Sequence, residues 1–292
     1  MRKDEWSLQG FGHKSLDIKT KIQISQTRGF HLTEYDTEDP RNQFPSPEAR
    51  ILEIDVQDSM SHLKSGEFLG GHTMPWGSNY TFMVWLSAGN NETCIRAIYK
   101  PRDGEKPLRD FPHGSLYKRE YSAYLISEEL SWPKIPPTII REGQYGVGSL
   151  QFYVDCDPRK TYFDMRDHHK EELIKFAVFD LLTNNGDRKA GHCMIDSASN
   201  LWSIDHGLTF HSSFKLRTVM LEYCGQPIPN NLLKDLKILA TKFEKSDDIK
   251  SILGQQISDL EIDALLRRLE GIIANPIFPV LDPYRDVPWP LV

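Results

Sequence analysis

The sequence predicts an α+β protein built from two lobes, a β-rich lobe followed by a mainly helical one. Residues 80–155 contain short runs of alternating apolar and polar residues separated by turn residues, which is typical of antiparallel strands. Residues 170–274 contain longer segments with apolar residues at helical spacing. We therefore expect one lobe at residues 59–155 and the other at residues 156–292.

Strands and one helix are expected in the first lobe. Residues 80–88 and 93–102 flank a short polar turn and predict a hairpin. Residues 136–155 predict two further strands around a glycine-containing turn. Between these pairs, residues 114–130 have an apolar side at helical spacing, and Ser115 is placed to cap the helix.

The second lobe is expected to be helical. Residues 170–184 are apolar on nearly every side, which indicates a helix buried in the core. Residues 231–244 and 258–274 are amphipathic, as expected for helices at the surface of a core. The last of these segments opens with a capping box formed by Ser258 and Glu261.

Residues 1–58 are polar and mixed in charge, so we expect a flexible N-terminal extension.

Composition and charge of the whole sequence disfavour several classes of protein. The net charge is −6 and no long Lys/Arg run is present, so nucleic acid is not an expected partner. No stretch approaches the length of a transmembrane segment and no signal peptide is visible, which predicts a cytoplasmic protein. The four scattered cysteines agree with a reducing compartment.

The stretch NNGDRKAGHCMIDSASNLWSIDHG, residues 184–207, carries two aspartates on either side of an expected hairpin. Phosphoryl transfer requires a carboxylate that orients the attacking oxygen, metal-held phosphates and a cation on the nucleotide. In kinases the base aspartate is followed by a metal-binding side chain, and a second metal-binding aspartate follows a short hairpin. Asp187, His192 and Asp205 occur in this order with kinase-like spacing.

Two upstream residues extend the same pattern. Lys100 ends an expected strand, as the phosphate-pairing lysine of kinases does. Glu120 lies on the helix that follows, where the partner of that lysine belongs. Each residue alone is commonly a solvated surface residue. Their order relative to Asp187 and Asp205 favours an active site.

Several other segments are distinctive in the same region. They are GSNYTF (77–82), YKPRDGEKPLRDFP (99–112), NNGDRKAGH (184–192), IDHGLTFH (204–211) and PWPLV (288–292). Together they resemble an uncharacterised bacterial family related to the phosphatidylinositol 3-/4-kinases. The resemblance covers about residues 60–292. It implies a two-lobed protein-kinase-like or phosphatidylinositol-kinase-like fold that binds ATP and a divalent metal, Mg²⁺ or Mn²⁺, between the lobes.

The resemblance also implies roles for individual residues. Asp187 would orient the acceptor hydroxyl, and Lys189 beside it resembles protein serine/threonine kinases more than lipid kinases, which slightly favours a protein or small-molecule acceptor. His192 and Asp205 would bind the metal. Because imidazole suits Mn²⁺ better than Mg²⁺, His192 in the usual asparagine position favours Mn²⁺. The nucleotide is expected to contact Lys100, Glu120, Ser78 and Asn79.

These features predict a metal- and ATP-dependent phosphotransferase of phosphatidylinositol 3-/4-kinase-like type with an unknown acceptor. One alternative is a nucleotide-binding pseudokinase that acts through protein interactions, and ATP turnover separates it from a kinase. A second alternative is a metallohydrolase that uses Asp187, His192, Asp205 and His206. Such a hydrolase would retain tightly bound metal without nucleotide.

Overall fold

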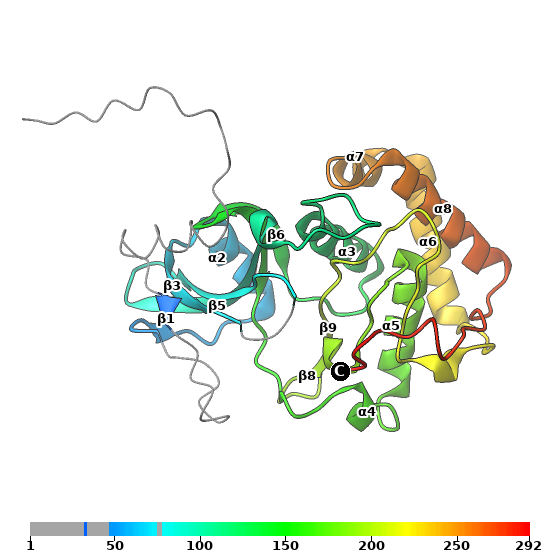
Figure 1. The fold of residues 1–292 in the computed structure, drawn as a ribbon, viewed down its shortest axis with the longest axis horizontal. Helices are drawn as coiled ribbons and strands as arrows, with labels where there is room; N and C mark the ends of the chain where they lie inside the picture. Colours follow the sequence, from blue (N-terminus) through cyan, green and yellow to red (C-terminus); the bar gives the residue numbers. More distant parts are fainter. Residues whose placement is uncertain (1–31, 34–46, 75–77) are drawn as a thin grey trace, which may run out of the picture.

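A sheet and a group of helices form two lobes in the computed structural model, which describes residues 32–33, 47–74 and 78–292 (Figure 1). This arrangement confirms the predicted two-lobed α+β fold. Most of the expected extension at residues 1–58 lies outside the described residues, as does Gly77. The boundary between residues 155 and 156 falls between the last strand of the sheet and the next helix, and it stays a prediction.

The sheet of the first lobe has the strand order β1-β3-β4-β5-β7-β6, with β2 paired to β5. The strands are β1 (Leu32–Thr33), β2 (Arg50–Ile51), β3 (Phe68–Thr73), β4 (Phe82–Ser87), β5 (Thr93–Pro101), β6 (Thr138–Gly143) and β7 (Gly146–Phe152). The predicted strands correspond to β4, β5, β6 and β7. Their buried residues pack with the short helix α2 (Ser59–Ser65) into one apolar core, in which Phe82, Val84 and Tyr99 are buried.

Strand β3 was not predicted from the sequence. It contains Gly70 and Gly71, and glycine lowers the strand signal because it offers no side chain to pack. A Cβ atom at Gly71 would lie 2.3 Å from the carbonyl oxygen of Met83 on β4. Glycine is therefore required there for the two backbones to pair.

Helix α3 (Leu116–Leu130) starts at a carboxylate from the preceding loop. The side chain of Glu105 accepts hydrogen bonds from the first two amides of α3, at 3.0 and 2.8 Å. Ser115 makes no capping bond, and its hydroxyl donates instead to the carbonyl of Pro112. The predicted Ser115 cap is therefore wrong, because a charged oxygen is the stronger acceptor at a helix N-terminus. Since Glu105 closely follows β5, it also fixes α3 relative to that strand.

The second lobe contains the helices α4 (Tyr162–Met165), α5 (Lys170–Thr183), α6 (Asn230–Lys245), α7 (Asp248–Gly254) and α8 (Asp259–Ala274), with the hairpin strands β8 (Cys193–Ile195) and β9 (Leu201–Ser203). The predictions of α5, α6, α8 and the hairpin are confirmed. So is the capping box of Ser258 and Glu261 at the start of α8. Helix α7 was not predicted.

No helix within the described residues is long and apolar enough to cross a bilayer.

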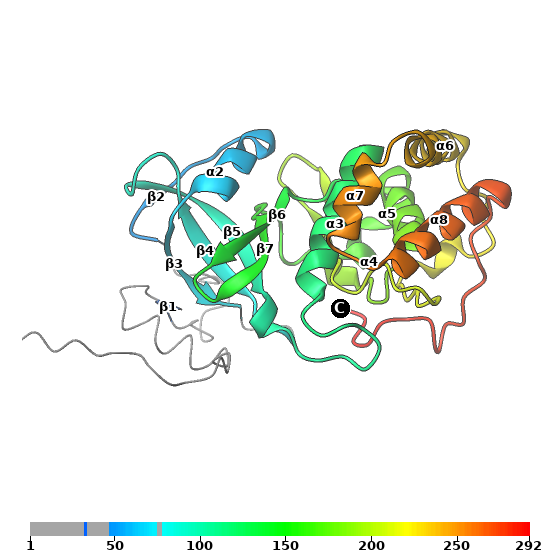
Figure 2. The ribbon, with the colours of Figure 1, turned by 90° about the horizontal axis from the view of Figure 1, so that it is seen from above.

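Helix α3 packs with the helical lobe although it follows the sheet strands in sequence. Its buried residues Ala123, Ile126 and Leu130 belong to the same apolar cluster as α5, α6 and α8. On its other side α3 contacts β6 and β7, so it lies between the sheet and the helices (Figure 2). A residue on α3 is thus placed to join the two lobes.

Candidate active site

Lys100, Glu120 and Asp205 meet where the two lobes face each other. The Nζ atom of Lys100, near the end of β5, contacts Oε1 of Glu120 on α3 and lies 2.9 Å from Oδ1 of Asp205. Glu120 is buried, whereas the side chain of Lys100 is 24% exposed and that of Asp205 is 44% exposed. A ligand can therefore reach Lys100 and Asp205, while the buried Glu120 holds the ammonium of Lys100 in place.

The charges of this cluster depend on one another. Burial alone lowers the pKa of Lys100, but the carboxylates of Asp205 and Glu120 outweigh it and hold that pKa above its ordinary value. Burial raises the pKa of Asp205, yet the charge of Lys100 is the strongest opposing influence, and the pKa of Asp205 lies well below its usual range. Lys100 is therefore a cation and Asp205 an anion at neutral pH. The backbone of Asp205 has a φ of 61°, a left-handed conformation that is uncommon outside glycine.

His192 presents a free electron pair to Asp205. Its Nδ1 lies 2.9 Å from the carbonyl oxygen of Asp187, which only accepts, so Nδ1 carries the proton. The amide of Lys189 is also 3.5 Å from Nδ1, too long to compete with this bond. Burial lowers the pKa of His192 to about 4, so the ring is neutral at pH 7. Its Nε2 lone pair then faces Oδ2 of Asp205 at 3.1 Å, a repulsive contact that a cation bound by both atoms would relieve.

Asp187 lies in the loop that leads to the short 3-10 helix Ala190–His192. The ammonium of Lys189 is 3.4 Å from its Oδ2 atom. Burial raises the pKa of Asp187 to about 6, and the nearby charge of Lys189 partly opposes this rise. A carboxylate with this pKa is ionised at pH 7 and still basic enough to take a proton.

Arg188 holds this loop in place, and the sequence analysis did not identify it. Its fully buried guanidinium pairs with both oxygens of Asp180 on α5, at 2.7 and 2.9 Å. It also donates to the carbonyl oxygens of His192 at 3.1 Å and Ile204 at 3.0 Å. One side chain thus connects α5 to the residues that precede Asp205. An aspartate inside an otherwise apolar helix was the signal for such a partner.

His206 is buried next to Asp205 and contacts residues that hold the site together. Its Nε2 lies 3.0 Å from the hydroxyl of Ser203 and 3.0 Å from the guanidinium of Arg188. Its backbone amide donates to Oε2 of Glu120 at 2.9 Å. A positive charge beside Nε2 disfavours a metal ion at that nitrogen, so the structure does not support the metallohydrolase alternative with His206 as a ligand through Nε2.

Ser78 and Asn79 lie in the connection between β3 and β4. The side chain of Asn79 accepts a hydrogen bond from the amide of Lys106 at 2.8 Å, and the amide of Tyr80 donates to the carbonyl of Gly104 at 2.9 Å. Both contacts tie the connection to the segment that follows β5. Ser78 is exposed. A role for Ser78 and Asn79 over nucleotide phosphates stays a prediction.

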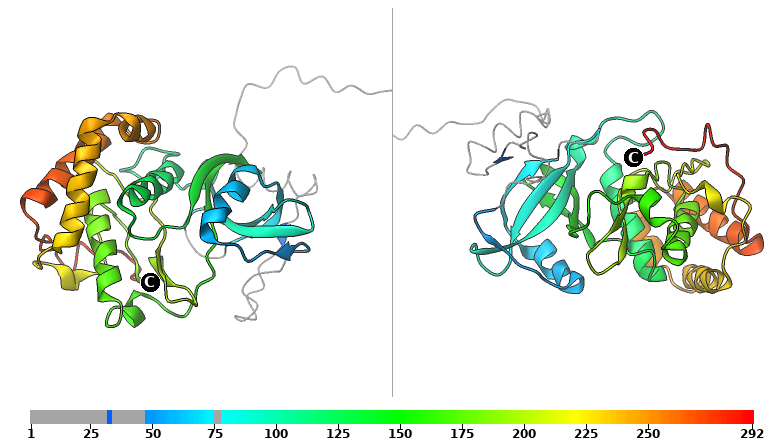
Figure 3. Two further views of the ribbon diagram at one scale, coloured as in Figure 1. Left: turned by 180° about the vertical axis from the view of Figure 1, so that it is seen from behind. Right: turned by 90° about the horizontal axis from the view of Figure 1, so that it is seen from below.

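The C-terminal PWPLV segment returns to the loop that carries Asp187. The amide of Ala190 donates to the carbonyl of Leu291 at 2.8 Å. The end of the chain accordingly lies beside the β8–β9 hairpin (Figure 3). Two of the segments that were distinctive in the sequence, 184–192 and 288–292, are therefore neighbours in the fold.

No family model matches the chain. Protein Rv2133c of Mycobacterium tuberculosis is 34% identical over 268 residues, which cover 80% of this chain and 95% of that protein. Phosphatidylinositol 4-kinase gamma 4 of Oryza sativa subsp. japonica is 25% identical over 175 residues, which cover 48% of this chain and 30% of the rice protein. Among solved structures, hydra Fam20 with sugar has a TM-score of 0.50 and 15% identity, covering 78% of this chain and 90% of that one.

The structural likeness concerns the fold alone, because identity at this level does not carry function. The chain therefore has a two-lobed, kinase-like fold. The match to the rice lipid kinase spans less than a third of that protein and shows no specific activity here. The mycobacterial protein, by contrast, is matched over nearly its whole length, and this chain belongs to the same family as protein Rv2133c.

Proposed function

We propose that this protein is an ATP-dependent phosphotransferase of phosphatidylinositol 3-/4-kinase-like type. The observation that carries the proposal is the contact of Lys100 with both Glu120 and Asp205, beside the free Nε2 of His192. Kinases require a lysine–glutamate pair and a metal-binding aspartate to be in place together. This combination of partners is what distinguishes the site from an ordinary surface ion pair.

The nucleotide and metal would be bound by residues from both lobes. Lys100 would contact the phosphates of ATP, and Ser78 with Asn79 would lie over them. His192 and Asp205 would hold a divalent metal, which neutralises phosphate charge when bound. Within the described part of the chain no three His, Cys, Asp or Glu side chains gather as a metal site. The phosphates of the nucleotide and water would supply further ligands.

Asp187 would act on the acceptor. As the acceptor oxygen bonds to the γ-phosphorus of ATP, Asp187 would take the hydroxyl proton, and the bond to the β-phosphate oxygen would break to release ADP. Lys189, 3.4 Å from Asp187, would steady that carboxylate and the transferred phosphoryl group. The lysine in this position supports a protein or small-molecule hydroxyl as acceptor rather than a lipid.

The substitution Lys100→Met tests the nucleotide site. It removes a preorganised cation, so turnover of ATP should fall by about 10²–10³, the loss seen when one such electrostatic donor is removed. ADP formation and calorimetric ATP affinity measure this change, and the thermal midpoint reports folding. Lys242→Met is the matched control, because Lys242 forms an exposed ion pair with Glu129, 2.9 Å long. Unchanged turnover and affinity in a folded Lys100→Met protein would remove Lys100 from the site.

The substitution His192→Asn tests the metal ligands. An imidazole among oxygens should favour Mn²⁺ over Mg²⁺ in ATP binding, and asparagine should move this preference toward Mg²⁺ by about tenfold, or about 1.4 kcal/mol. Because the pKa of His192 is about 4, wild-type binding should be constant from pH 7 to 5 and weaken only near pH 4. Calorimetric titrations with each metal measure both effects. An unaltered metal preference in the variant would make His192 a structural residue.

A further inference from the structure

Arg119 and Glu120 are neighbours on α3 and bond to opposite ends of the turn His206–Thr209. Oε2 of Glu120 accepts from the amide of His206 at 2.9 Å. The guanidinium of Arg119 donates to the carbonyl of Thr209 at 2.7 Å. The hydroxyl of Thr209 closes the turn by donating to the carbonyl of His206 at 2.7 Å. Since this turn directly follows Asp205, α3 fixes the backbone that carries the proposed metal ligand.

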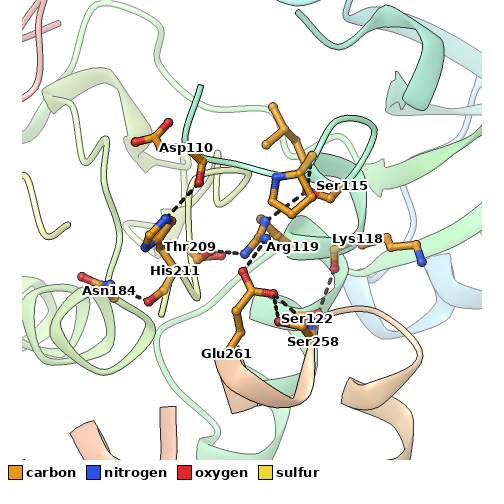
Figure 4. A network of polar contacts seen from close by, with 12 residues as sticks. Asp110, Ser115, Lys118, Arg119, Ser122, Asn184, Thr209, His211, Ser258 and Glu261 are labelled. Carbon is orange, nitrogen blue, oxygen red and sulfur yellow. Dashed lines mark hydrogen bonds and ion pairs between the residues drawn. The ribbon is translucent and has the colours of Figure 1, made fainter. Parts of the chain in front are cut away.

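Arg119 in turn is bound to α8 (Figure 4). Its guanidinium is buried and lies 2.6 Å from Oε1 of Glu261. The other oxygen of Glu261 accepts from the amide of Ser258 at 3.0 Å and from its hydroxyl at 2.9 Å. The guanidinium carbon is also 4.9 Å from the centre of the Phe111 ring. The ion pair therefore joins α3 to the start of α8, while the ring contact packs Arg119 against the loop that precedes α3.

Glu120 and Arg119 connect the candidate active site to the contact between α3 and α8. Successive residues of an α-helix project about 100° apart, so Glu120 faces Lys100 while Arg119 faces α8. A movement of α3 relative to α8 that separates Glu120 from Lys100 also breaks the bonds of Arg119. Breaking a buried ion pair leaves an uncompensated charge and is strongly unfavourable. Helix α3 is therefore held where Glu120 meets Lys100.

We infer that Arg119 is a positioning residue for the proposed phosphotransfer. By tying α3 and the turn His206–Thr209 to α8, it keeps Glu120 and Asp205 in the positions where both contact Lys100. The chemical consequence rests on the proposed function. The positioning itself is a property of the fold and is measurable without activity.

The double variant Arg119→Met/Glu261→Gln tests this inference. It removes both charges of the buried ion pair while the amide oxygen of Gln can still accept from Ser258, so the thermal midpoint should stay near that of the wild type. The carbonyl of Thr209 nevertheless loses its donor. Backbone amides of residues 204–211 should then exchange hydrogen at least about tenfold faster. The kcat for ATP should fall by about 100-fold, the cost of a small misplacement, while KM changes less.

A second variant covers the case in which the double variant does not fold. Arg119→Lys keeps a positive charge beside Glu261, but a compact ammonium does not reproduce the fork that reaches both Glu261 and Thr209. It should stay folded and show faster exchange over residues 204–211 with a lower kcat. The control is Lys242→Met, which removes an exposed ion pair from α3 to α6 and should change neither quantity by more than about twofold.

The outcomes separate the inference from the proposed function. Faster exchange over residues 204–211 at a normal thermal midpoint supports positioning by Arg119, even if the wild type forms no ADP and the proposed function fails. Wild-type exchange over these residues in a folded variant overturns the inference whatever the activity. So does a wild-type kcat in the double variant at a normal thermal midpoint, because Arg119 would then not position the active site.

Discussion

Replacing Asp205 by Asn is expected to abolish metal-dependent binding of ATP while the protein stays folded. Burial works against the charge of Asp205, but Lys100 above all keeps its pKa low, so Asp205 supplies the negative charge that faces the expected metal position. Asparagine removes that charge and leaves Glu120 as the partner of Lys100. We expect ATP affinity with Mn²⁺ or Mg²⁺ to fall by at least about 100-fold, or about 2.8 kcal/mol, in calorimetric titrations.

A matched control for this prediction is Asp248→Asn. Asp248 lies at the start of α7 and accepts a hydrogen bond from Ser246. None of the contacts given above for Lys100, Glu120, His192 and Asp205 involves Asp248. Its replacement should leave ATP affinity within about twofold of the wild type. Strong Mn²⁺-dependent binding that survives in Asp205→Asn would place the metal elsewhere and remove the support for the proposed site.

Asp187→Asn is expected to reduce turnover of ATP by about 10²–10⁴, the usual contribution of a general base, while ATP affinity changes by less than about threefold. The pH dependence identifies the group. Burial raises the pKa of Asp187 to about 6, and only its deprotonated form takes a proton. Wild-type kcat should therefore rise as pH increases through about 6 and level off above pH 7. The variant should lack this rise.

The measurement is ADP formation at saturating ATP between pH 5 and 8, with the thermal midpoint followed over the same range. A pH profile that is the same in Asp187→Asn as in the wild type would show that another group accepts the proton. In that case Asp187 would belong with Asn185, whose side chain accepts from its amide at 3.0 Å, as part of the loop structure.

The sequence predicted the contacts that depend on short, local patterns. Lys100 was placed by an alternating strand, Glu120 by a helical segment, and Asp205 by a hairpin, and each of these elements is present. That these side chains meet, although Lys100 and Asp205 are 105 residues apart, was expected only from the kinase-like order of the residues. His192 was recognised by its spacing from Asp187, since that loop is short and its residues stay close together.

Contacts between distant segments were not accessible in this way. Arg119 and Glu261 each look like solvated charges on amphipathic helices, and their burial depends on how α3 packs against α8. Arg188 and Asp180 share this difficulty, because a buried pair is visible only once the core is assembled. The cap of α3 was missed for the same reason, since Glu105 reaches the helix from a separate loop.

Formation of ADP from ATP and Mn²⁺ by the purified protein tests the proposed phosphotransfer most directly. The acceptors offered are a serine/threonine peptide library, phosphatidylinositol vesicles and water, and a parallel reaction contains EDTA. We expect ADP to form, to require the metal and to be reduced in Lys100→Met and Asp187→Asn. Tight metal-dependent ATP binding with no ADP from any acceptor, and no phosphate or adenylate on the protein by mass spectrometry, would contradict phosphotransfer and favour a nucleotide-binding pseudokinase.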